Sequence, residues 1–292
     1  MSARRAKKKK VLNTLIVILL LVIVLCGAAI FLLVHHWRQE PAEPTVPTEA
    51  TAESIPETTP PATAATEPTT EPTAPETEAP EPQQPENLTK LLEHNGTSCD
   101  ALLQAGCSQL VVVVSQGTAA DIRFFSCTDG LWEELHDLAC DGYVGRSGVL
   151  AAKQEGDGST PSGLYRIGSA FYIDDAPDTA LDTFRVTKDT YWVDDADSMF
   201  YNQRVEGTEN KDWNSAEHMI DYEAEYRYGF VVNYNVLGIP DAGSAIFFHI
   251  NDAPTAGCIA TEEDMVLAYL AELDKEKCPS ILIVSGEALA SE

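Results

Sequence analysis

A cysteine and a histidine near the C-terminal end of the chain have the residue types of a nucleophile and its base. Residues 245–260 read AIFFHINDAPTAGCIA, in which His249 ends an apolar run and Cys258 follows nine residues later. A thiol becomes a strong nucleophile when it ionises, and a nearby imidazole and helix-terminal N–H groups favour the thiolate. A structural histidine and a small buried cysteine are the plainer interpretations, and this pair alone does not decide between them.

The turn just before Cys258 suits the support of a reacting carbonyl group. Gly257 has no side chain and lets a substrate backbone come close. Backbone N–H groups of Gly257 and Cys258 would form an oxyanion hole, and Thr255 is assigned a supporting role beside them. Residues 262–274 follow with helical spacing of apolar residues, and Thr261 with Asp264 resembles a capping box.

The elements expected to position this pair are mainly short strands. Apolar or alternating runs separated by Gly, Asp and Pro predict strands at 109–114, 121–126, 163–167, 184–187, 229–234, 245–250 and 281–284. Only the late segment 262–274 is clearly helical. Because strands and helices do not alternate, a doubly wound α/β fold is not expected.

Two motifs together resemble the L,D-transpeptidase catalytic domain family, the YkuD-like proteins. Residues 155–165 read EGDGSTPSGLY, and the His and Gly-Cys elements follow about 85 residues later. The family carries G-x-TP-x-G-x-[FY] on a strand–turn–strand, then a His, then [ST]-H-G-C-x-[NR]. The resemblance covers residues 108–285 or so, and it implies a mainly β catalytic domain, a β-sandwich or barrel-like sheet with a few helices.

The resemblance also implies a reaction. Cys258 would attack the carbonyl of the third, diamino-acid residue of a peptidoglycan tetrapeptide stem, and D-alanine would leave. His249 would take the thiol proton, or hold a preformed thiolate as imidazolium, and later protonate the leaving group. An amine of a neighbouring stem would then attack the thioester and form a 3→3 cross-link. No metal or organic cofactor is implied.

The sequence departs from the family motif at two positions that matter for substrate binding. Ala256 stands where the family has a second His, and Ala260 stands where it has Asn or Arg. The interval from His249 to Cys258 is also short for the family. Substrate contacts are therefore expected from other groups, for which we single out His218 and Arg227.

Two other functions remain open at this level. In an L,D-carboxypeptidase or a related wall peptidase, water would take the acyl group from the same nucleophile. In the second alternative, the departures at Ala256 and Ala260 mark a non-catalytic module that binds or organises the cell wall.

The charge of the chain excludes nucleic acid as its main partner. The formal net charge is -27 at pH 7. Residues 1–39 hold seven Lys and Arg and no acid, whereas residues 87–292 hold 12 Lys and Arg against 35 Asp and Glu. A C-terminal part this acidic repels a polyanion.

The N-terminal part predicts a membrane anchor. Residues 11–34 carry no charge among 24 residues, long enough for a hydrocarbon core of about 30 Å. Six basic residues in the 1–10 tail precede this run, so we expect a cytoplasmic N-terminus and a single-pass protein of the cell membrane whose catalytic domain lies on the cell-wall side. A cleaved signal peptide is the alternative.

A linker is predicted between the anchor and the catalytic domain. Residues 40–86 contain 12 Pro, 11 Thr and 11 Glu, a composition that does not bury a core. We therefore divide the chain into the 1–10 tail, the 11–34 anchor, a disordered 35–86 linker and an 87–292 catalytic domain.

Six cysteines lie beyond the anchor, and an even number outside the cytoplasm is compatible with three disulfides. If Cys258 is a free thiol, at least one other is unpaired. Among the other cysteines we suggest a disulfide between Cys127 and Cys140, or between Cys99 and Cys107. No partner is suggested for Cys278.

Overall fold

The structure is a computed structural model that describes residues 83–287. Its α-helices are α2 (Glu86–His94), α3 (Cys99–Gln104) and α4 (Glu263–Glu272). Its strands are β1 (Gln109–Gln116), β2 (Ala119–Thr128), β3 (Leu131–Glu134), β4 (Cys140–Tyr143), β5 (Val149–Leu150), β6 (Thr160–Pro161), β7 (Gly163–Tyr172), β8 (Thr183–Arg185), β9 (Thr190–Val193), β10 (Arg204–Glu206), β11 (Ala216–His218), β12 (Tyr228–Val232), β13 (Phe247–Ile250), β14 (Ile259–Thr261) and β15 (Ser280–Ser285).

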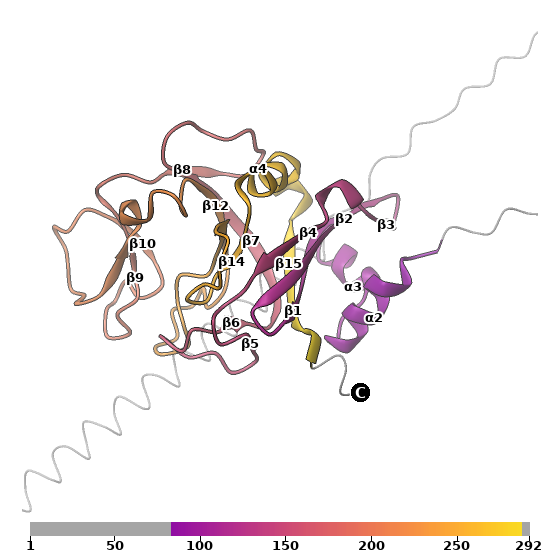
Figure 1. Ribbon diagram of the computed structural model, residues 1–292, viewed down its shortest axis with the longest axis horizontal. Coiled ribbons are helices and arrows are strands. Elements are labelled where there is room, and N and C mark those ends of the chain that lie inside the picture. The colour runs from indigo at the N-terminus through magenta and orange to yellow at the C-terminus, as the bar shows by residue number, and fades with distance from the viewer. Residues whose placement is uncertain (1–82, 288–292) are drawn as a thin grey trace, which may run out of the picture. The chain divides into compact units, whose positions relative to one another are not determined.

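The main sheet closes on itself. Its strands follow the order β1-β15-β7-β12-β13-β14-β4-β2-β3, β8 adds to β7, and β1 also pairs with β2. The ring encloses a core that includes Phe124, Phe230 and Phe248, on which Tyr269 of α4 packs. This arrangement, seen in the centre of Figure 1, confirms the expected mainly β, barrel-like fold with a few helices.

A second, three-stranded sheet of order β10-β9-β11 packs against one side of the ring. An apolar cluster joins the two: Trp192 of β9 and Met219 just after β11 pack with Phe171 and Phe247 of the main sheet. Cys258 belongs to the same cluster. The candidate nucleophile therefore lies where the small sheet meets the large one.

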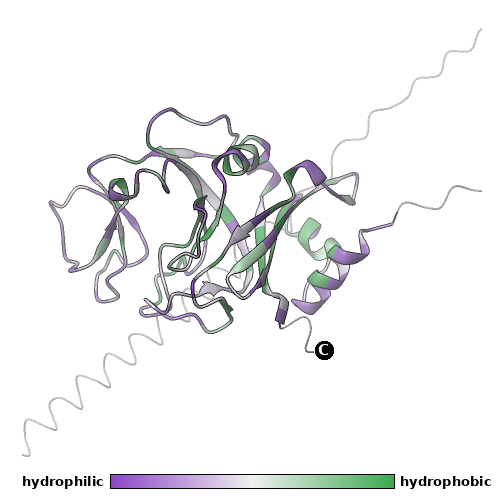
Figure 2. Cartoon of the chain, viewed as in Figure 1, coloured by the Kyte–Doolittle hydropathy of each residue, from purple (hydrophilic) through white to green (hydrophobic). Residues whose placement is uncertain are grey.

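Helices α2 and α3 cover the opposite side of the sheet. Leu88, Leu92 and Leu102 are buried there against Phe125 and neighbouring strand residues. Figure 2 shows that both helices carry hydrophobic and hydrophilic residues, as expected of helices that cover a sheet. The sequence interpretation did not anticipate these two helices.

Each of the seven segments predicted as strands overlaps an observed strand, and the predicted helix is observed as α4. The predicted capping box is wrong. Glu262 is the N-cap residue of α4 and makes no side-chain capping bond. Thr261 Oγ1 instead donates a hydrogen bond to the Asp141 carbonyl, 2.8 Å away, and so ties β14 to β4.

The tail, the anchor and all but the last four residues of the linker fall outside the described residues, so they stay predictions. Within residues 83–287, no helix is long and apolar enough to cross a membrane. The described domain begins slightly before residue 87, because α2 starts at Glu86.

Candidate active site

Cys258 and His249 come from two adjacent parallel strands and share one face of the sheet. In the β13–β14 register, Phe248 lies opposite Ile259 and His249 opposite Ala260. Phe248 and Ile259 point into the ring. Because side chains alternate along a strand, His249 and Cys258 point the other way, toward the small sheet.

Both residues line a cleft of about 390 Å³. Little of either is exposed, 6% of Cys258 and 5% of His249. The cleft is strongly acidic: four carboxyl-bearing and two cationic side chains line it, namely Glu155, Asp194, Glu217, Glu225, Arg146 and Lys153. The structure thus brings the expected nucleophile and base into one pocket.

The Cys258 thiol is held by backbone groups. Its Sγ donates to the Ala245 carbonyl at 3.2 Å and accepts from the Phe247 N–H at 3.3 Å. Burial raises the pKa of the thiol to about 12, and the nearby charge of Glu217 acts in the same direction. At neutral pH the resting thiol is therefore protonated. Of the two expected alternatives, this favours removal of the thiol proton by His249 over a preformed thiolate. Helix α4 begins five residues after Cys258.

His249 is a neutral base with a defined tautomer. Its Nδ1 lies 2.9 Å from the Ile250 carbonyl, which only accepts, so Nδ1 carries the proton and the lone pair lies on Nε2. Burial lowers the pKa of His249 to about 4, although the hydrogen bond to Ile250 and the charge of Glu225 oppose this effect. The ring of Tyr226 meets the imidazole edge on, 5.2 Å between ring centroids.

Residues 251–258, here called the Cys258 loop, are fixed mainly through Thr255. Its backbone N–H donates to the Val144 carbonyl, and its carbonyl accepts from the Arg146 N–H. Its Oγ1 donates to the Cys258 carbonyl at 2.7 Å and accepts from the Gly257 N–H at 3.0 Å. Thr255 is thus a scaffold of the loop, and the Gly257 N–H is already engaged by it.

Gly257 is required by space as well as by conformation. Its φ is +154°, and a Cβ there would lie 2.9 Å from the Ser159 carbonyl oxygen. That carbonyl also accepts from the buried Lys153 Nζ at 2.8 Å. The TP-containing motif therefore packs directly beneath the nucleophile turn.

Lys153 forms a buried ion pair with Asp157 at 3.1 Å. Burial acts to raise the pKa of Asp157, but hydrogen bonds from the backbone of Gln154 and Ser159, from the Ser159 hydroxyl and from Lys153 outweigh it and lower the pKa to about 2. The acidic turn before the TP motif thus has a structural role, and its lysine lies next to the Cys258 loop.

Glu217 and Asp194 were not singled out by the sequence analysis. Glu217 accepts a hydrogen bond from the Tyr226 hydroxyl at 3.0 Å, whereas its Oε2 and Asp194 Oδ1 are buried without a partner in the described part of the chain. Burial raises the pKa of Glu217 to about 7, and the nearby charges of Asp194 and Glu155 raise it too. The hydrogen bond from Tyr226 acts in the opposite direction. No sequence motif marks either residue, because the small sheet brings both to the cleft.

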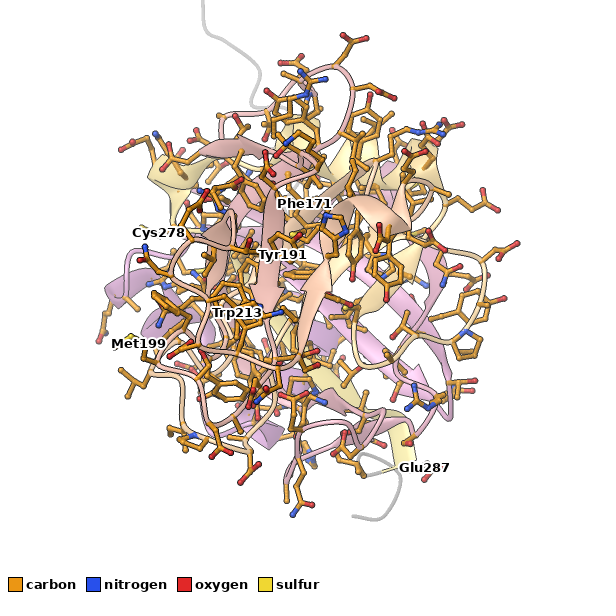
Figure 3. All side chains as sticks on the ribbon, turned by 90° about the vertical axis from the view of Figure 1, so that its left-hand side faces the viewer. Phe171, Tyr191, Met199, Trp213, Cys278 and Glu287 are labelled. Atoms are coloured by element: carbon orange, nitrogen blue, oxygen red, sulfur yellow. The ribbon has the colours of Figure 1, made fainter. Side chains whose placement is uncertain are left out.

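His218 and Arg227, the two residues predicted to bind substrate, do not line this cleft. His218 stacks on Tyr191, which is labelled in Figure 3, and its Nδ1 lies 3.0 Å from Asp221. Arg227 pairs with Glu263 at 3.2 Å. Arg146 is the arginine of the cleft; it is exposed, and no carboxylate of residues 83–287 lies within ion-pair distance of it.

All six cysteines of the described domain are free thiols, so neither suggested pair is formed. Cys99, Cys107 and Cys127 pack together in the cluster beneath α2 and α3, whereas Cys140 packs against the core of the ring. Within residues 83–287, no group of three or more His, Cys, Asp or Glu side chains is arranged to hold a metal ion.

A closed, mainly β sheet thus carries a cysteine and a histidine in one cleft, and these are the residue types that cysteine-dependent acyl transfer uses. The model of the YkuD family, the L,D-transpeptidase catalytic domain, matches residues 111–278. The chain therefore belongs to this family.

Two solved structures resemble the chain more distantly. Both are crystal structures of the helical cell shape determining protein Pgp2 from Campylobacter jejuni, one of them a mutant, with TM-scores of 0.32 and 0.31 at 16% and 15% sequence identity. The likeness covers 60% of this chain and 47% or 46% of the other, so this chain spans about half the length of those proteins. No curated protein matches the sequence.

Proposed function

We propose that the protein is an L,D-transpeptidase that forms 3→3 cross-links between peptidoglycan stem peptides during assembly or remodelling of the cell wall. The observation that carries this proposal is that Cys258, just before β14, and His249 of β13 line one cleft within the family's domain. The acidic cleft around them supports a substrate with free amines.

The first half of the reaction follows from the neutral resting state of the pair. His249 Nε2 takes the proton of the Cys258 thiol as Sγ attacks the carbonyl carbon of the third stem residue. The tetrahedral intermediate collapses, its C–N bond breaks, and the imidazolium gives its proton to the nitrogen of the departing D-alanine. A thioester on Cys258 remains.

Positioning of the donor stem is assigned to Arg146 and to the backbone of the Cys258 loop. Arg146 provides an exposed, unpaired guanidinium in the cleft for a substrate carboxylate. The Cys258 N–H is the backbone donor assigned to the oxyanion, because the Gly257 N–H already donates to Thr255 Oγ1. These contacts take the place of those lost with the family's second His and its Asn or Arg.

We further propose that the protein is anchored by residues 11–34, with the 35–86 linker holding the domain on the cell-wall side of the membrane. The uncharged run and the basic residues before it support this topology.

The test is incubation of the purified full-length chain with a defined tetrapeptide stem, followed by mass spectrometry of the products. Free D-alanine and a cross-linked dimer are expected, and both disappear in Cys258→Ala. D-alanine without dimer would identify a carboxypeptidase. A folded protein with no Cys258-dependent product would favour a wall-binding module.

A further inference from the structure

Three polar side chains of the cleft lack the hydrogen bonds that their burial requires. Among residues 83–287, four buried side-chain nitrogen or oxygen atoms have no partner, and three of the four belong to residues that line this cleft: Glu217 Oε2, Asp194 Oδ1 and Ser244 Oγ. Only 7% of Ser244 is exposed. Buried polar atoms without protein partners are rare and costly, so their concentration in one cleft marks a place where a polar ligand would be favoured.

The position of the three residues relates them to the nucleophile. Ser244 precedes Ala245, whose carbonyl accepts the hydrogen bond of the Cys258 thiol and whose φ of +51° is unusual for a residue with a side chain. Glu217 lies near enough to Cys258 and to Asp194 for their charges to interact. The three residues with unpartnered oxygens therefore line the same cleft as the thiol, two of them through the Glu217–Asp194 interaction and one through the segment that holds Sγ.

The two carboxylates among Glu217, Asp194 and Ser244, here called the acidic wall, favour a cation over a neutral or anionic ligand. Lys153, one of the two cations of the cleft, is already engaged by Asp157 and the Ser159 carbonyl. No ion pair joins Lys153 or Arg146 to Glu217 or Asp194 in the described domain. A cation with several N–H donors could give hydrogen bonds to the oxygens of Glu217, Asp194 and Ser244 that have no partner in the described domain.

We propose that Glu217, Asp194 and Ser244 form the binding site for a primary ammonium group, the side-chain amine of the acyl acceptor. The three N–H bonds of an ammonium match two carboxylate oxygens and one hydroxyl oxygen. This inference rests on the proposed function, because it concerns the second half of that reaction.

The site also accounts for the protons of the second half-reaction. The acceptor ammonium gives one proton to the Glu217 carboxylate and becomes a nucleophilic amine. The amine nitrogen attacks the thioester carbon, the C–N bond forms and the C–S bond breaks. The second proton passes through His249 to the departing thiolate, which restores the thiol, and the third stays on the new amide. Glu217 then releases its proton to solvent.

Tyr222 lines the cleft at the edge of this group of residues and is partly exposed to solvent. Tyr222 is 43% exposed and lies near both Glu217 and Asp194. Its ring packs on Tyr226 at 5.3 Å between centroids but is not part of the buried core. The amine would therefore enter beside a side chain that is partly exposed.

The test compares Glu217→Gln and Asp194→Asn with Glu223→Gln, a control at an exposed glutamate outside the cleft. Full-length protein is given a tetrapeptide stem with a free side-chain amine. We expect the ratio of cross-linked dimer to released D-alanine to fall at least tenfold in the two cleft variants and to stay at the wild-type value in the control. An unchanged ratio in folded Glu217→Gln and Asp194→Asn protein would overturn the proposal.

A binding measurement makes the outcome independent of catalysis. In the Cys258→Ala background, calorimetry compares the free-amine stem with the same stem acetylated on that amine. The free-amine stem should bind at least tenfold more tightly, and Glu217→Gln should abolish the difference. Equal binding of the two stems would overturn the amine site, whereas absence of D-alanine release by the wild type would overturn the proposed function alone.

Discussion

Thr160 Oγ1 donates a hydrogen bond to the Gly257 carbonyl at 2.8 Å, and so joins two motifs that lie 97 residues apart in the sequence. The same oxygen accepts from the Gly145 N–H at 2.8 Å. Gly145 lies so close to Gly158 that a Cβ would meet its carbonyl oxygen at 2.3 Å. One buried hydroxyl thus fixes the Cys258 loop against the turn that carries the TP motif.

Removal of this hydroxyl should destabilise the domain and inactivate the site. Thr160→Val keeps the shape but leaves the Gly145 N–H and the Gly257 carbonyl without this partner, at a cost of about 1–3 kcal/mol. Urea unfolding should show the loss, and D-alanine release should fall even where the protein is folded. Thr160→Ser retains the hydroxyl and should preserve both. Equal activity of the Val and Ser variants would contradict the assigned role.

The resting thiol should be unreactive at neutral pH. Because the pKa of Cys258 is raised to about 12 and that of His249 is lowered to about 4, the thiolate fraction should grow tenfold per pH unit from pH 7 to 10. Alkylation by iodoacetamide, followed at Cys258 by mass spectrometry with the exposed Cys278 as internal reference, should show this slope. A rate that levels off below pH 8 would mean a preformed thiolate instead.

The sequence predicted most strands of the ring, though not β4 or β14, because the side chains of the longer strands report burial locally. In β1 and β15, near-continuous Val, Ile and Leu runs are buried on both faces, and no tertiary information is needed to recognise them. Helix α3 was missed because six residues do not establish a helical period. Helix α2 was missed although Leu88, Leu91 and Leu92 have helical spacing, because it begins at Glu86, the last residue of the predicted linker. The capping box failed because Thr261 found a tertiary acceptor on β4.

The residues of the cleft also fall into two groups, those that the sequence indicates and those that only the fold brings there. Cys258 and His249 lie within one short segment with motif-like neighbours, so the sequence indicates them directly. Glu217 and Asp194 reach the cleft only because β9 and β11 pair and pack against the ring. Arg146 reaches it because its N–H binds the Thr255 carbonyl, 109 positions away. Such placements depend on long-range topology, which a single sequence does not reveal.

Arg146, rather than Arg227, should determine the affinity for the donor stem. A charge-assisted contact to a substrate carboxylate contributes about 1.5–3 kcal/mol, so Arg146→Ala should raise KM for the tetrapeptide roughly tenfold or more. Arg227 pairs with Glu263 outside the cleft. Steady-state D-alanine release should therefore show little effect of Arg227→Ala, and none of Arg185→Ala, an exposed control. A higher KM in Arg227→Ala alone would return the role to that residue.

Glu217 should make the folded domain less stable as the pH rises. Its pKa is raised from 4.5 in an ordinary glutamate to about 7 in the fold, so between these values the folded state keeps a proton that the unfolded state has lost. The stability that the protonated group contributes is fully present below pH 4.5 and is lost as the pH passes 7, by an amount on the order of 3 kcal/mol. The lowered pKa of Asp157, about 2, acts only below pH 4 and does not overlap with this window.

Glu217→Gln removes this titration and keeps the size of the side chain. Thermal unfolding at pH 5 and at pH 8 should therefore show a Tm difference between variant and wild type that shifts in favour of the variant at the higher pH. Glu223→Gln, at an exposed position, should follow the wild type at both values. A Glu217→Gln difference that is the same at pH 5 and at pH 8 would mean that the carboxyl does not titrate between these values, which contradicts a pKa of about 7.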